Sequence, residues 1–297
     1  MMNNKMFQSL ICSGSVFLLA AVASAFHPHP HYRPISTMIP RRRLRNIMST
    51  SSGGSSRSWS RSGASNGSNS NNNNEVDGPL PELVVFDLDA CFWDQEMYTL
   101  SRIPTESDVV MGDLNGRGVG VASVISGRSR ISLHDGSLLA LQNHHDGMYP
   151  NTRVCFASSA DTELAENIGR ATLKLLEVIP GVTVWDLVVN RDWDGVDVNQ
   201  IGRRPPLSSN KSATHFPILR ELTRVRYDRM LFFDDCQWGD HCGQVERACK
   251  EINTGKGPVT IRTPYGLGVD EWEAGIEKYA KTFQALDGID NYDIKKK

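Results

Sequence analysis

The first 74 residues of this 297-residue chain contain no Asp or Glu, although the whole chain has 34 acidic residues. The same segment holds eight Lys and Arg, so residues 75–297 carry 34 acidic residues against 24 basic ones. An acidic segment of this kind argues against nucleic acid as a partner. Residues 75–297 have the length of one domain, and we expect them to form it.

The sequence also lacks an apolar run long enough to cross a membrane. The apolar segment at residues 16–23 is short, follows Lys5 and ends in Ala23-Ser24-Ala25, which is typical of a cleavable signal peptide. Residues 26–74 are rich in Ser, Asn and Arg, as transit peptides are, and end in a low-complexity linker. We therefore expect a signal peptide at 1–25, a transit peptide with linker at 26–74, and no membrane contact of the mature domain. Secretion alone and a basic arm that binds nucleic acid are the alternatives.

No two of the six Cys form a C-x-x-C pair, the spacing that many zinc sites use. Cys236, Cys242 and Cys249 are six and seven residues apart, which argues against a zinc site. Cys91 lies in an apolar context, and no activating base is apparent near it in the sequence. A nucleophilic role for Cys91 is therefore the weaker alternative to an inert buried thiol.

Apolar runs alternate with amphipathic segments in residues 75–297, which predicts βαβ units and a parallel sheet. Glycines between Val and Ile runs at residues 111–133 predict a β-hairpin flap beside the end of the first strand. No segment is long enough for a folded cap domain. We expect an open site whose selectivity depends on this flap and on the loop at 190–210. The predicted strands are 83–87, 153–157, 184–189, 228–233 and 258–262; the predicted helices are 134–145, 161–177, 212–223, 240–252 and 269–284.

Paired acids follow two of the predicted strands. Asp87 and Asp89 come at the end of the first, and Asp234 and Asp235 at the end of the fourth. Ligands bind at this end of the strands in an open α/β sheet, and residues two apart on a strand point to the same side. For one such pair alone, a strand followed by an Asx turn is the preferred explanation. Two pairs predict a single acidic pocket that needs a divalent cation.

Four motifs occur in one order along the chain: Phe86-Asp-Leu-Asp-x-x-x-Trp93, Ala157-Ser158, Lys211-x-x-x-His215-Phe216 and Phe232-Phe-Asp-Asp235. Over residues 82–283 the chain resembles the magnesium-dependent phosphatases of the haloacid dehalogenase superfamily. The resemblance implies an α/β fold in which helices sandwich a Rossmann-like parallel sheet. It also implies Mg²⁺ as the cofactor.

The residue chemistry gives the acids separate roles. An ionised Asp can attack phosphorus and form an acyl phosphate, and Asp87 is the candidate nucleophile. Asp89 is the candidate general acid and base. By the resemblance, Asp234 and Asp235 hold Mg²⁺ together with the carboxylate of Asp87 and the backbone carbonyl of Asp89.

Three further residues are candidates for phosphate binding. Ser158 offers a hydroxyl and a backbone N–H to a phosphate oxygen, or caps a helix through the Ser158-x-x-Asp161 pattern. Ser159 stands beside it, and by the resemblance Lys211 neutralises both the phosphate and Asp87.

The chain departs from the family pattern at three places. Cys91 stands where a Thr is usual, Ser159 where an Arg is usual, and the run at 236–240 replaces the usual residues near the metal. These changes put the support of the nucleophile loop and the affinity for phosphate in doubt.

Together these features predict a Mg²⁺-dependent phosphomonoester hydrolase that works through an aspartyl-phosphate. The resemblance implies phosphotyrosine-like or sugar-phosphate groups, carried by a small molecule or a phosphoprotein. The alternative is a catalytically silent protein of the same fold that binds a phosphorylated ligand. The junction Ala25-Phe26 resembles the bipartite presequence of diatoms, which implies a plastid location.

Overall fold

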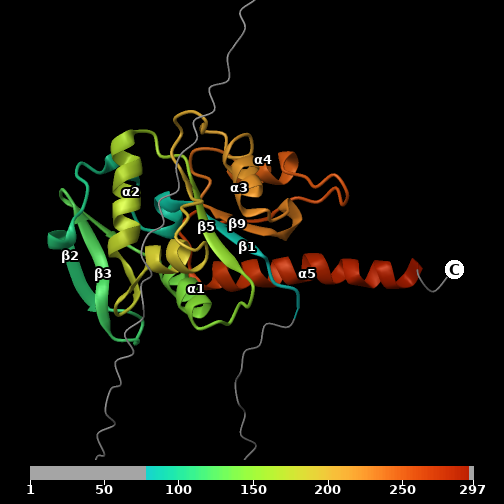
Figure 1. The fold of residues 1–297 in the computed structure, drawn as a ribbon, viewed down its shortest axis with the longest axis horizontal. Helices are drawn as coiled ribbons and strands as arrows, with labels where there is room; N and C mark the ends of the chain where they lie inside the picture. The colour runs from blue at the N-terminus through green and yellow to red at the C-terminus, as the bar shows by residue number, and fades with distance from the viewer. Residues whose placement is uncertain (1–77, 294–297) are drawn as a thin grey trace, which may run out of the picture. The chain divides into compact units, whose positions relative to one another are not determined.

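The computed structural model describes residues 78–293, and the predicted signal and transit peptides lie outside them. Within this range ten strands and five longer helices alternate along the chain (Figure 1). The strands are β1 (Leu83–Phe86), β2 (Val109–Asp113), β3 (Val119–Ser126), β4 (Ser129–Ser132), β5 (Arg153–Ser158), β6 (Glu177–Ile179), β7 (Val182–Thr183), β8 (Gln200–Ile201), β9 (Met230–Asp234) and β10 (Val259–Arg262). The helices are α1 (Asp135–His145), α2 (Glu163–Leu175), α3 (His215–Thr223), α4 (His241–Ala248) and α5 (Val269–Asp293).

The central sheet has the strand order β10-β9-β1-β5-β8, and all its pairings are parallel. Strand β1 lies in the middle, where Phe86 is in register with Phe156 of β5 and Phe233 of β9. Asp87 follows β1 directly and Asp234 is the last residue of β9. The parallel register therefore brings both acids to one edge of the sheet, as expected from the sequence.

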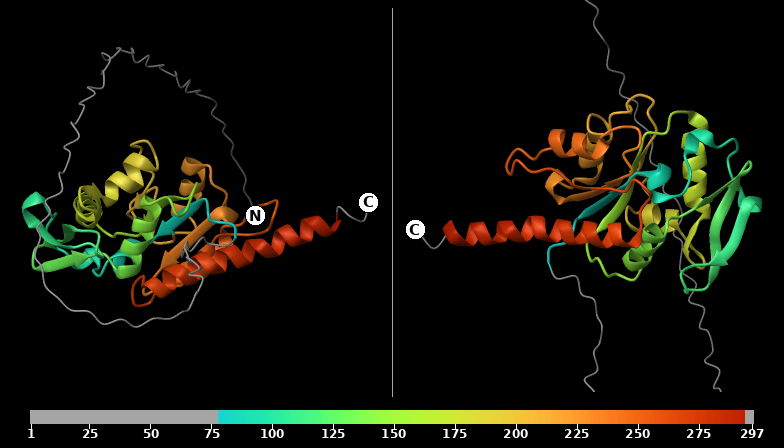
Figure 2. Two further views of the ribbon diagram at one scale, coloured as in Figure 1. Left: turned by 90° about the horizontal axis from the view of Figure 1, so that it is seen from below. Right: turned by 180° about the vertical axis from the view of Figure 1, so that it is seen from behind.

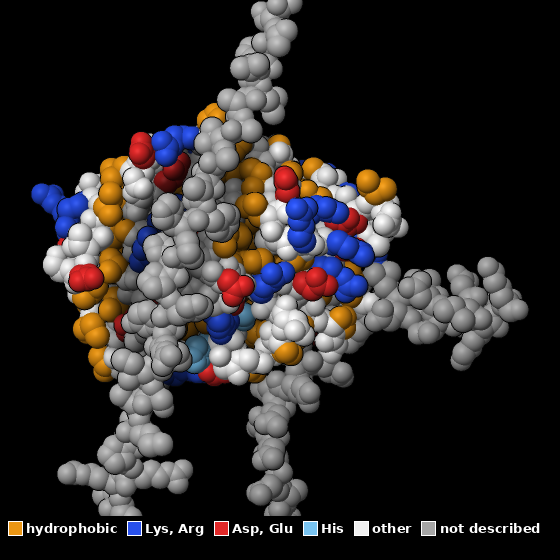
Figure 3. All heavy atoms as spheres, in the orientation of Figure 1, with side chains coloured by type: hydrophobic (Ala, Val, Ile, Leu, Met, Phe, Trp, Pro, Cys, Tyr) orange, Lys and Arg blue, Asp and Glu red, His pale blue; other side chains and the backbone are white. Residues whose placement is uncertain are grey.

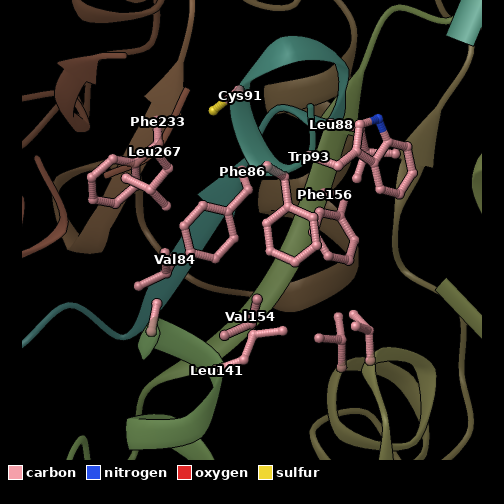
Figure 4. Close-up of a cluster of buried hydrophobic side chains, with 14 of the residues drawn as sticks. Val84, Phe86, Leu88, Cys91, Trp93, Leu141, Val154, Phe156, Phe233 and Leu267 are labelled. Carbon is pink, nitrogen blue, oxygen red and sulfur yellow. The ribbon is translucent and has the colours of Figure 1, made fainter. Parts of the chain in front are cut away.

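Alternate residues of the central strands face two helical layers. Val84 and Phe86 of β1 point to the side that packs against α1, α2 and α5, together with the same-face residues of β5 and β9 (Figure 4). Phe86 stacks on Phe233 with ring centroids 5.4 Å apart. Leu83 and Val85 point to the opposite side, which α3 and α4 cover. The chain therefore has the predicted α/β architecture, with a parallel sheet between helices.

The predicted hairpin flap is larger than expected, and Leu133 at its end bridges to Trp93 in the loop after β1. Strands β2, β3 and β4 form an antiparallel three-stranded sheet, so residues 109–132 contain two hairpins. This sheet lies on the side of α2 away from α3 and α4 (Figures 1 and 2). The backbone N–H of Val121 donates to Glu177 at 3.0 Å, which joins β3 to β6.

The strand predicted at residues 184–189 is wrong. The chain forms a helical turn at Asp186–Arg191 there, and the fifth strand of the central sheet is the short β8. The apolar run is buried as expected, but a continuous apolar run does not distinguish a strand from a buried helical segment. Thr183 starts the turn, because its hydroxyl accepts from the N–H of Asp186 at 3.0 Å and donates to the Asp186 carboxylate at 2.7 Å.

Charges of both signs share the exposed surface of the described residues. Figure 3 shows Lys and Arg side chains beside Asp and Glu on the α3 and α4 side of the face drawn there. Asp240 pairs with Arg247 at 3.4 Å and also with Arg262. None of the described helices combines the length and the apolar character that a membrane span requires.

Candidate active site

The predicted nucleophile Asp87 and the predicted metal ligand Asp234 meet at Lys211. Its Nζ lies 2.7 Å from Asp87 Oδ1 and 2.7 Å from Asp234 Oδ2. The lysine is only 1 % exposed and belongs to the segment between β8 and α3. Burial alone lowers the pKa of a Lys, but the two carboxylates outweigh it and raise the pKa of Lys211. The ammonium group therefore stays charged between two acids.

Asp87, Asp234 and Asp235 form a buried cluster that suits a metal ion. Each offers a carboxylate oxygen, and these oxygens lie within 4.8 Å of one another. The negative charge of the three carboxylates, when ionised, exceeds the single positive charge of Lys211. Hard divalent cations prefer oxygen ligands of this kind. The donor set therefore fits a divalent cation.

Burial shifts the protonation of these acids in different directions. It raises the pKa of Asp87 to about 7 despite the neighbouring Lys211, and raises that of Asp235 to about 6, with repulsion from Asp234 adding to it. Burial also opposes ionisation of Asp234, but Lys211 and His241 outweigh it and hold the pKa of Asp234 well below the ordinary value. A cation at the cluster would favour the ionised forms of all three.

Asp89 lies in a different environment from Asp87. Its Oδ1 accepts from the backbone N–H of Met97 at 3.1 Å and from the indole N–H of Trp93 at 3.4 Å. Burial, followed by repulsion from Asp87, raises the pKa of Asp89 well above the ordinary value. A carboxyl with a raised pKa is better suited than an ordinary Asp to donate a proton to a leaving group.

The hydroxyls of Ser158 and Ser159 are buried and have no hydrogen-bond partner among the described residues. Both residues line the cavity that contains Asp87 and Lys211. The predicted capping role of Ser158 is wrong, because α2 begins later and Thr162 caps it by accepting from the N–H of Ala165 at 3.1 Å. The two free hydroxyls next to a lysine instead favour the phosphate-binding interpretation.

His215, the first residue of α3, ties the end of β5 to the segment after β8. Its Nε2–H donates to the carbonyl oxygens of Ser158, at 3.1 Å, and of Gly202, at 3.0 Å. Burial, followed by the charge of Lys211, lowers the pKa of His215 to about 4. The neutral ring therefore holds the end of β5 against the loop after β8.

Cys91 is buried beneath the nucleophile loop. The hydroxyl of Thr263, just after β10, donates to its Sγ at 3.2 Å, and the carbonyl of Cys91 accepts from the N–H of Leu267 at 2.9 Å. Ala90 has φ 51°, in the left-handed region, so the chain turns sharply between Asp89 and Cys91. Contacts from the segment after the edge strand β10 therefore support this loop in addition to its own hydrogen bonds, such as that from the N–H of Ala90 to the carbonyl of Gln95 at 3.1 Å.

The cavity over these residues has a volume of about 410 Å³. Every residue that lines it lies at or after the carboxyl end of β1, β5, β8 or β9, where ligands bind in an open α/β sheet. No residue of the β2–β4 sheet lines it, which contradicts the expectation that this flap controls selectivity. The predicted loop at 190–210 contributes Arg203 and Ser209. The full lining is Asp87, Asp89, Glu96, Tyr98, Ser158, Ser159, Asp161, Arg203, Ser209, Lys211, Asp235, Trp238 and His241.

His241 is a site residue that the sequence reasoning missed. Its Nδ1 lies 3.2 Å from Asp234 Oδ2, and this contact raises the pKa of the imidazole. The signal was its position at the start of a helix a few residues after Asp234-Asp235. The preceding residue, Asp240, caps α4 by accepting from the N–H of Gly243 at 2.8 Å.

A family model described as Acid Phosphatase matches residues 79–282. The chain belongs to this acid phosphatase family. It is therefore a phosphatase of the haloacid dehalogenase type, a class that generally uses a divalent metal, and its substrate carries a phosphate group. A comparison with curated proteins gave no match.

His215 predicts a pH dependence of stability. In the unfolded acid phosphatase its pKa returns to the ordinary value of 6.5, whereas folding lowers it to about 4. Protonation therefore favours unfolding. The contribution of the neutral His215 to the free energy of unfolding is fully present above pH 6.5. It falls towards pH 4 by up to about 1.4 kcal/mol per pH unit.

We expect the variant His215→Asn to lose this contribution, so that its free energy of unfolding falls less steeply between pH 6.5 and 4. Urea unfolding of both proteins over this range measures the difference. The same pair at pH 8, where His215 is neutral in both states, gives the loss from packing and hydrogen bonds alone. Equal slopes for the two proteins would show that His215 titrates alike in both states.

Proposed function

We propose that the protein hydrolyses phosphomonoesters through an aspartyl-phosphate on Asp87, with Mg²⁺ as the cofactor. The observation that carries the proposal is the buried ammonium of Lys211, 2.7 Å from both Asp87 and Asp234. Lys211 neutralises the nucleophile and the incoming phosphate, which otherwise repel each other. Asp87, Asp234 and Asp235, with the backbone carbonyl of Asp89, would hold Mg²⁺, which supplies charge stabilisation to the phosphoryl oxygens when bound.

The reaction has two halves. The carboxylate of Asp87 attacks phosphorus, the bond between phosphorus and the ester oxygen breaks, and the protonated Asp89 gives its proton to the leaving oxygen. Water then attacks the acyl phosphate, Asp89 takes a proton from it, and inorganic phosphate leaves with Asp87 restored. Ser158 and Ser159 donate hydrogen bonds to the phosphoryl oxygens throughout.

The substrate class that we propose is phosphotyrosine-like or sugar-phosphate groups. The cavity volume of about 410 Å³ supports a leaving group that enters beside the phosphate. Since every lining residue comes from loops at one edge of the sheet, both small molecules and phosphate groups on a protein surface have access.

Replacing the nucleophile tests the mechanism. We expect Asp87→Asn to abolish hydrolysis of p-nitrophenyl phosphate, because the amide cannot attack phosphorus. Asp89→Asn keeps the nucleophile, and with this good leaving group it should accumulate phosphoenzyme in rapid-quench experiments with labelled substrate. The matched control Asp270→Asn exchanges an exposed acid in the first turn of α5 and should keep full activity. Activity of Asp87→Asn above a few per cent, with deamidation excluded by mass spectrometry, would exclude this nucleophile. Phosphate binding by the wild type without any hydrolysis would instead support the silent binding protein.

The metal is tested by removal and return. We expect EDTA to abolish activity and Mg²⁺ to restore it, because the three carboxylates need a counter-charge. Ca²⁺ should inhibit, since it accepts looser geometries and more ligands than Mg²⁺. Steady-state rates after dialysis against each ion measure this. Full activity after chelation, or recovery with Zn²⁺ only, is the result that contradicts the assignment.

We propose that residues 1–74 direct the protein to the plastid of an alga with a secondary plastid. The acid-free composition and the junction Ala25-Phe26 support this. A fluorescent reporter fused to these residues should accumulate in the plastid, and Phe26→Ala should divert it to an earlier secretory compartment. A cytosolic reporter would overturn the proposal, and a secreted one would favour the alternative of simple secretion.

A further inference from the structure

Two aromatic side chains stand exposed at the mouth of the cavity. Tyr98 is 52 % exposed and Trp238 is 72 % exposed, and both line the cavity that holds Asp87 and Lys211. Their ring centroids are 6.0 Å apart and their planes meet at 82°. In an edge-to-face pair, the ring that contributes its edge keeps both faces open. Large apolar groups exposed in a binding cleft commonly mark the part that contacts a ligand.

A hydrogen bond restrains the ring of Trp238, and a short turn fixes the backbone that carries Tyr98. The indole N–H of Trp238 donates to Glu96 Oε1 at 3.3 Å. Tyr98 belongs to the turn Met97–Thr99, in which the side chain of Met97 is buried and its N–H donates to Asp89. These contacts and the pairing of the two rings restrain them before a ligand arrives, which lowers the conformational entropy cost of binding.

The position of the pair relative to the phosphate site determines what it would contact. Ser158 and Lys211 occupy the deep, buried part of the cavity, whereas Tyr98 and Trp238 are exposed. A phosphate bound at the deep residues directs its ester oxygen, and the group attached to it, outward. Ring faces attract other planar rings through stacking and dispersion, and they offer few hydrogen bonds to a polyol.

We infer that Trp238 and Tyr98 form a stacking subsite for the leaving group and select phosphomonoesters that carry a planar aromatic ring. The inference rests on the proposed function. Two kinds of substrate share this chemistry: aryl phosphates, in which the ring bears the ester oxygen, and nucleoside monophosphates, in which a sugar separates the ring from the phosphate.

Substrate comparisons test the subsite. We expect Trp238→Leu to lower kcat/KM by about fivefold to tenfold for substrates that stack. For glucose 6-phosphate the change should stay within about twofold. Trp238→Phe, which keeps a ring, should restore most of the loss, and Tyr265→Leu is the matched control because Tyr265 is 94 % exposed and does not line the cavity. Phosphotyrosine and AMP form the two arms, and the one that loses more on Trp238→Leu identifies the source of the ring. Equal losses for glucose 6-phosphate and both ring substrates would overturn the inference.

Binding separates this inference from the catalytic proposal. Phenylphosphonate and methylphosphonate share an anionic group that cannot be hydrolysed, and only the first carries a ring. By calorimetry with Mg²⁺ present, the wild type should bind phenylphosphonate at least about fivefold more tightly, and Trp238→Leu should bind the two alike. Equal affinities in the wild type would overturn the stacking subsite even if the enzyme is active. If the protein bound neither phosphonate, that result would contradict the proposed phosphate site and therefore also the inference.

Discussion

The site depends on one buried cation placed between two acids. Lys211 is 1 % exposed, and a buried ammonium is tolerated only where anionic partners surround it. Asp87 and Asp234 supply them because β1 and β9 are neighbours in parallel register and both acids stand at the carboxyl end. The lysine comes from a third segment, between β8 and α3. Its contacts therefore fix the position of this loop relative to the sheet, and His215 at the start of α3 fixes the end of β5 to the same loop.

The same strands supply both the core and the site. Phe86 and Phe233 stack within the hydrophobic layer, and the next residue of each strand is a carboxylate of the site. A displacement of either strand along its axis would disturb both the aromatic packing and the acid cluster. The rigidity of a close-packed interior thus positions the charged groups, and a divalent cation would compensate the acid charge that Lys211 alone does not neutralise.

The parts of the molecule that periodicity describes were predictable from the sequence. Strands β1, β5, β9 and β10 follow from apolar runs, and Asp87 and Asp234 follow from their place at the strand ends. Glu96, Arg203 and Trp238, which were not predicted, line the cavity from loops, whose conformation depends on single contacts such as the bond from Trp238 to Glu96. No pattern in the sequence specifies such a contact. The strand wrongly predicted at residues 184–189 has a related cause. The burial of this run was predicted correctly, but the hydrogen bond from Asp186 to Thr183 stabilises a helical turn there.

Two of the three departures from the family pattern, at Cys91 and Ser159, concern the position of a chemical group more than its kind. Cys91 takes the place of a Thr, yet a Thr hydroxyl reaches its sulfur from Thr263, at the end of β10. Ser159 takes the place of an Arg, yet the guanidinium of Arg203 enters the cavity from the loop after β8, where it lies 3.5 Å from Asp161. In a comparison position by position, the chain lacks the usual Thr and the usual Arg. The folded chain places a hydroxyl and a guanidinium in the same neighbourhood from distant segments, so the substitutions alone are no argument against phosphatase chemistry.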